Sequence, residues 1–124
     1  MENYKIYIDT DKPSVKIKFS ISYLRPSESW NWATSQTRET GYRVNAVPVE
    51  ISEDGKIESF TAFSGFGATL LPCKRRSQKR YEEAQLILMK DLPSYLQWFI
   101  NKGYNIPEET RKSIMEQRKN ELGV

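Results

Sequence analysis

The stretch "SVKIKFSISYL", residues 14–24, alternates apolar and polar side chains with the period of a β-strand. On one side, the strand would carry Val15, Ile17, Phe19, Ile21 and Tyr23. On the other side, it would carry Lys16, Lys18, Ser20 and Ser22. This pattern is typical of an antiparallel sheet that buries one face and leaves the other in water. We therefore expect a sheet that is covered on one side only.

Strand signals continue on both sides of this stretch. The segment "YKIYI", residues 4–8, alternates in the same way, and the "DTDKP" that follows is a plausible turn, so the two segments predict a hairpin. Further strands are predicted at residues 41–51, 57–63 and 68–72. Residues 3–73 should therefore form an antiparallel sheet of about five strands.

The third of these strands, "GYRVNAVPVEI", has an irregular pattern. Its alternation changes phase near Ala46–Val47, and Pro48 has no backbone N–H to donate to a neighbouring strand. Both features predict that Pro48 lies on an edge strand or at a β-bulge.

After Ser77, which is an acceptable N-cap, the apolar period changes to that of helices. We predict C-terminal helices at about 77–103 and 107–122, with the first broken or kinked at Asp91-Leu92-Pro93. The second helix has a thin apolar stripe, so it should pack weakly or contact another copy in a homo-oligomer. The prediction is one α+β domain, residues 1–124, with its helices on one face of the sheet.

The composition is that of a globular protein without a membrane segment. Of the 124 residues, 38% are hydrophobic and 28% are charged, and no apolar run approaches the roughly 20 residues that span a bilayer. The N-terminus "MENYKIYIDT" lacks the layout of a signal peptide. We therefore expect a cytoplasmic protein with no membrane partner.

The residues needed for most catalysis are missing. Cys73 is the single cysteine and the chain has no histidine, which excludes an internal disulfide, the usual zinc sites and a histidine base for the thiol. Acidic pairs such as Glu82–Glu83 are adjacent in sequence and so point to different faces of a helix. We expect no metal, no cofactor and no enzymatic activity. An enzyme whose carboxylates converge from separate elements is the third alternative.

The segment 74–80 is unusual in its charge. It contains the basic cluster, which we define as Lys74, Arg75, Arg76, Lys79 and Arg80. Cations at a helix N-terminus are disfavoured by the helix dipole, by a few tenths of a kcal/mol each. Either the cluster is a solvated turn that tolerates this small cost, or it binds an anionic partner, which the dipole would also attract.

Residues 25–40, "RPSESWNWATSQTRET", form a long connection without a clear strand or helix signal, and such loops are often functional. Trp30 and Trp32 would point to the same side of an extended backbone. They could stack on nucleic-acid bases, anchor a protein partner, or fold back and plug the core.

These features together favour a binding module. Alternation places Lys5, Tyr7, Lys16, Lys18 and, if its strand pairs in phase, Arg43 on the sheet face opposite the helices. Cations, a tyrosine and a Trp-bearing loop suit single-stranded nucleic acid. The leading prediction is a non-enzymatic nucleic-acid-binding protein that uses the basic cluster, Trp30, Trp32, Lys16 and Lys18. The alternative is a small regulator or inhibitor of the kind encoded by phages or mobile elements, which would bind an acidic protein surface.

Overall fold

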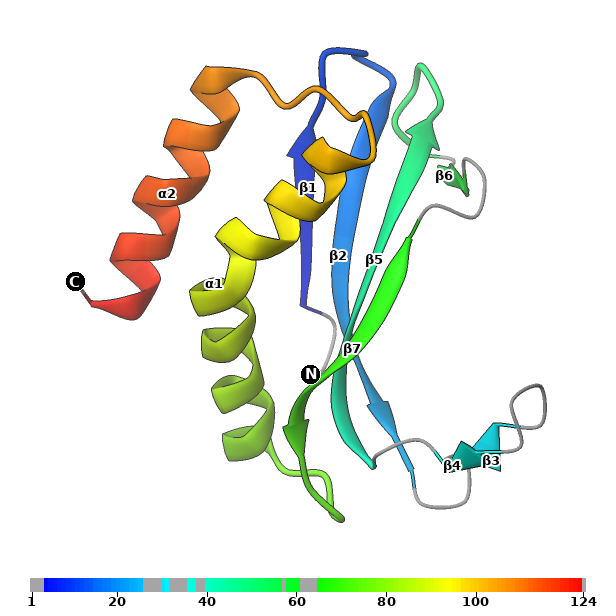
Figure 1. Cartoon of the computed structure of the whole chain (residues 1–124), viewed down its shortest axis with the longest axis vertical. Coiled ribbons are helices and arrows are strands. Elements are labelled where there is room, and N and C mark those ends of the chain that lie inside the picture. Colours follow the sequence, from blue (N-terminus) through cyan, green and yellow to red (C-terminus); the bar gives the residue numbers. More distant parts are fainter. Residues whose placement is uncertain are drawn as a thin grey trace.

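The computed structural model of the chain describes residues 4–25, 30–31, 36–37, 40–56, 58–60 and 65–123, with backbone alone at 30–31, 36–37 and 60. Its elements are β1 (Lys5–Asp9), β2 (Val15–Leu24), β3 (Trp30–Asn31), β4 (Gln36–Thr37), β5 (Gly41–Ile51), β6 (Glu58–Phe60), β7 (Phe66–Pro72), α1 (Gln78–Asn101) and α2 (Glu108–Leu122). Figure 1 shows α1 and α2 on the same side of the sheet. The predicted α+β fold, with a five-stranded antiparallel sheet followed by two helices, is confirmed.

The sheet is built around β2 and β5. These two long strands pair with each other over their whole length, from Val15 opposite Glu50 to Leu24 opposite Gly41. The outer side of β2 pairs with β1, which confirms the predicted hairpin. The other side of β5 pairs with β7 through residues 41–46 and with β6 through residues 49–51.

Pro48 does not lie on an edge strand, so that part of the prediction is wrong. It sits in the central strand β5, opposite Ile17, in a register with β2 that has no bulge. On its other side, Pro48 falls between the residues that pair with β7 and those that pair with β6, where a residue without an N–H is best tolerated. Burial changes phase at Pro48–Val49, two residues later than predicted.

The core lies between α1 and the apolar face of the sheet. Phe19 of β2 and Phe99 of α1 are fully buried, and their rings meet edge to face with centroids 6.0 Å apart. The sheet contributes Ile8, Ile17, Ile21, Tyr42, Val44 and Ala46, and α1 contributes Tyr81, Ala84, Leu88, Met89, Leu92 and Leu96. By contrast, α2 buries Ile114 alone, as its thin stripe predicted, and its contact with another copy stays a prediction.

Of the predicted break or kink at Pro93, the break is wrong, because α1 continues through this residue, and the kink stays a prediction. A proline has no N–H, so the carbonyl of Met89, one turn earlier, loses its normal helical donor. Arg118 of α2 replaces it. Its Nε donates to the Met89 carbonyl at 3.1 Å, and its Nη2 donates to the Lys90 carbonyl at 3.3 Å. Thus α2 supplies the hydrogen bond that Pro93 withholds.

Arg118→Met keeps much of the side-chain length but removes these donors. We expect it to lower the free energy of unfolding by about 1–2 kcal/mol, because a partly buried carbonyl loses its partner. In a Pro93→Ala background, the backbone N–H at position 93 is restored, so the same substitution should cost much less. Urea denaturation of the two single variants and the double variant measures this coupling. Equal costs of Arg118→Met in both backgrounds would show that the two residues act independently.

Candidate nucleic-acid interface

One end of the sheet brings two sequence features together. There β2 ends at Leu24, β5 begins at Gly41 and β7 ends at Pro72, and these three residues are cross-strand neighbours. The N–H of Cys73 also donates to the carbonyl of Thr40 at 3.1 Å. Residues 25–40 are called the Trp-bearing segment below. The chain therefore enters this segment, and returns from it, next to the start of the basic cluster (Figure 1). We call this the basic end of the molecule.

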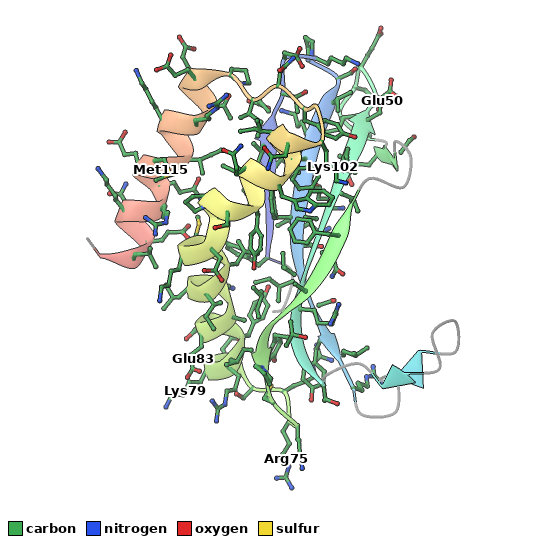
Figure 2. All side chains as sticks on the ribbon, in the orientation of Figure 1. Glu50, Arg75, Lys79, Glu83, Lys102 and Met115 are labelled. Carbon is green, nitrogen blue, oxygen red and sulfur yellow. The ribbon has the colours of Figure 1, made fainter. Side chains whose placement is uncertain are left out.

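The basic cluster spans the turn before α1 and its first turn. Ser77 is the N-cap, as predicted, and its Oγ accepts the N–H of Arg80 at 3.1 Å. Three of the five cations precede the helix, two lie in its first turn, and that turn holds no acidic residue. All five side chains are exposed. Figure 2 shows Arg75 pointing away from the body at the tip of this turn.

Two acidic residues of α1 lie next to this charge. Glu83 contacts Arg80 with an N–O distance of 3.5 Å, and such exposed pairs contribute little. Glu82 accepts a hydrogen bond from Gln78. The guanidinium of Arg76 lies over the ring of Tyr23, 5.5 Å from its centre, which ties the turn to β2. The cluster is thus positioned by the fold and faces solvent.

The Trp-bearing segment contains a short ladder that its sequence did not predict. In this ladder Trp30 pairs with Thr37, and Asn31 pairs with Gln36. The side chain of Trp30 and all of Trp32 lie outside the described residues, so stacking, anchoring and core plugging all stay predictions.

The sheet face opposite the helices carries the predicted cations. Lys5, Tyr7, Lys16, Lys18 and Arg43 share this face, as the strand registers require. However, Lys16 pairs with Asp9, and Lys18 pairs with Glu58 at 2.8 Å. These lysines also lie at a distance from the basic end, since Lys18 is about 20 Å from Leu24 at the normal rise of a strand. The fold therefore does not bring Lys16 and Lys18 to the basic cluster.

Glu58 is a residue of this face that the sequence did not reveal. It accepts hydrogen bonds from Lys18 and from the hydroxyl of Tyr7. The hydrogen bonds from Lys18 and Tyr7 lower the pKa of Glu58, and the hydrogen bond to Glu58 raises the pKa of Lys18 and of Tyr7. At neutral pH, Glu58 and Lys18 are therefore an ion pair. Only the position of β6 shows this contact. Asp9, which the sequence placed in the turn after residues 4–8, instead ends β1 opposite Lys16.

Other kinds of site find no support in the described part of the chain. Its residues contain no group of three or more metal-binding side chains, and neither α1 nor α2 is long and apolar enough to cross a membrane. Cys73 is a half-buried free thiol.

Comparisons with protein-family models, with curated proteins and with solved structures gave no match to this chain. Function must therefore be inferred from the geometry of the basic end.

Proposed function

We propose that the protein is a non-enzymatic module that binds single-stranded nucleic acid at its basic end. The observation that carries this proposal is the meeting of two features, the exposed basic cluster and the two ends of the Trp-bearing segment. Proteins that bind single strands combine cations that follow the phosphates with aromatic rings on which bases stack.

The start of α1 suits a phosphate group. The helix dipole disfavours Lys79 and Arg80 in the first turn, and no acidic residue of that turn compensates. A phosphate placed between the helix amides and the guanidinium groups would be attracted by both. The electrostatic cost in the free protein would then become affinity in the complex.

The tryptophans give the direct test of this proposal. Titration with a short single strand such as oligo-dT should quench their fluorescence, because bases stack on indole rings. Trp30→Ala and Trp32→Ala should each weaken binding by about 1–3 kcal/mol, the usual contribution of one stacked base. Duplex DNA should quench less, since its bases are already stacked.

Trp98 provides a matched control. It lies near the C-terminal end of α1, away from the basic end, where it packs on Phe66 and Phe99. Trp98→Phe should remove background fluorescence and leave the affinity unchanged. The proposal is contradicted if oligonucleotides neither quench fluorescence nor bind at low salt. Blue-shifted emission, together with unfolding of both alanine variants, would instead identify Trp30 and Trp32 as core residues.

A further inference from the structure

The sheet face opposite the helices divides into two halves of different charge. The half farther from the basic end, the paired half, contains Tyr7, Asp9, Lys16, Lys18 and Glu58. Its four charged residues form two ion pairs, Lys16 with Asp9 and Lys18 with Glu58. The half nearer the basic end, the polar half, contains Ser20, Ser22, Arg43, Asn45, Gly67 and Thr69, which are cross-strand neighbours in β2, β5 and β7. None of these six residues is acidic.

Arg43 is held in place within the polar half. Its Nη1 donates to the Thr69 hydroxyl at 3.1 Å. A Cβ atom at position 67 would lie 3.3 Å from Nη2, so glycine leaves room for the guanidinium to lie over β7. Because a guanidinium has five N–H donors, this arrangement leaves donors for a ligand. Beside it, the Asn45 amide donates to the Ser22 hydroxyl at 2.8 Å.

The polar half adjoins the basic end. Arg43 is two residues from the start of β5 and Ser22 two residues from the end of β2, which is about 7 Å along a strand. In the paired half, the carboxylates of Asp9 and Glu58 would repel phosphates. Charge therefore favours a polyanion over the polar half, whereas the ion pairs of the paired half leave its lysines already neutralised.

We propose that a single strand bound at the basic end continues across the polar half, where Arg43 contacts a phosphate and Ser22 and Asn45 contact neighbouring polar groups of the strand. This inference rests on the proposed function. It makes Arg43, rather than Lys16 or Lys18, the cation of the two central strands β2 and β5 that binds the ligand on this face.

The experiment compares two variants that lose the same charge on the same face, Arg43→Gln and Lys16→Gln. Binding to a fluorescently labelled oligo-dT of about 20 nucleotides, long enough to fill a typical single-strand site, is measured by fluorescence anisotropy at several salt concentrations. Arg43→Gln should lower the affinity about tenfold. It should also make the plot of log affinity against log salt concentration shallower by about 0.7, the value of one lost phosphate contact on a single strand. Lys16→Gln should change neither quantity, and Arg43→Lys should keep most of the slope.

The possible failures are distinguishable. If the wild-type protein binds no oligonucleotide, the proposed function fails. If the wild-type protein binds and the two glutamine variants behave alike, the inference is overturned while the proposed function stands. Should Arg43→Gln fail to fold, Thr69→Val removes the anchor of Arg43 and should weaken binding about threefold, as expected when one hydrogen bond that positions a ligand group is lost. An unchanged affinity in Thr69→Val would then overturn the inference.

Discussion

Gly41→Ala is expected to remove much of the protein's stability, at least about 3 kcal/mol of the free energy of unfolding. Gly41 has a φ of 143°, a conformation that side chains rarely adopt. A Cβ there would also lie 2.8 Å from the N of Cys73 and from the Cα of Pro72, and would collide with the Leu71 carbonyl oxygen. All three are backbone atoms, so β5 and β7 must move apart to make room. Urea denaturation monitored by circular dichroism measures the loss.

Gly55→Ala is the matched control, because Gly55 also has a positive φ, 73°, but a Cβ at this position would have no atom within 4 Å. It should cost about 1 kcal/mol, which is the backbone penalty alone. The difference between the two variants isolates the collision. Similar denaturation midpoints for Gly41→Ala and Gly55→Ala would mean that β5 and β7 separate there at little cost, contrary to the expectation.

The position of Gly41 links this stability effect to function. Gly41 is the residue at which β2, β5 and β7 meet, and the chain returns there from the Trp-bearing segment beside Cys73. The close approach that excludes a side chain is therefore the same contact that brings this segment to the basic cluster.

Local patterns were sufficient to predict most of the fold. The bounds of β5 and the pairing of β1 with β2 follow from alternation and turn residues, because a strand with one buried face must repeat every two residues. The start of α1 follows from Ser77, since a cap is a property of a few adjacent residues.

The errors arise where a distant partner decides the outcome. Pro93 suggested a break, but the compensating donor is Arg118, on another helix. Pro48 suggested an edge, but its environment depends on where β6 and β7 pair with β5. Glu58 neutralises Lys18 from β6, which lies on the other side of β5 from β2. Each case needed a contact between residues far apart in sequence.

The candidate site was predictable in parts only. The basic cluster is visible as a run of cations, but its proximity to the Trp-bearing segment follows from the pairing of Gly41 with Pro72. The difference between Arg43 and Lys16, which lie on the same face, likewise appears only when their neighbours are placed.

Charge reversal in the basic cluster should have the largest effect on binding. Arg75 and Lys79 are the best positions to change, because Arg76 lies over Tyr23 and Arg80 contacts Glu83. The double variant Arg75→Glu, Lys79→Glu should weaken binding to oligonucleotides of any sequence about 100-fold at low salt. The log–log salt slope should become shallower by about 1.4, which corresponds to two lost phosphate contacts on a single strand. Titrations by anisotropy between low and moderate salt give both quantities.

The matched control is Lys112→Glu, Lys119→Glu, which makes the same change in net charge on exposed positions of α2. It should leave the slope unchanged, and equal losses in both double variants would mean that overall charge, rather than a site, attracts the oligonucleotide. Thermal stability supplies the second criterion. The helix dipole stabilises a glutamate at position 79 by a few tenths of a kcal/mol. The free energy of unfolding of the binding-deficient variant should therefore equal that of the wild type or be slightly higher. A cluster that binds phosphates should therefore change affinity and stability in opposite directions, whereas a solvated turn without a partner would give no change in affinity.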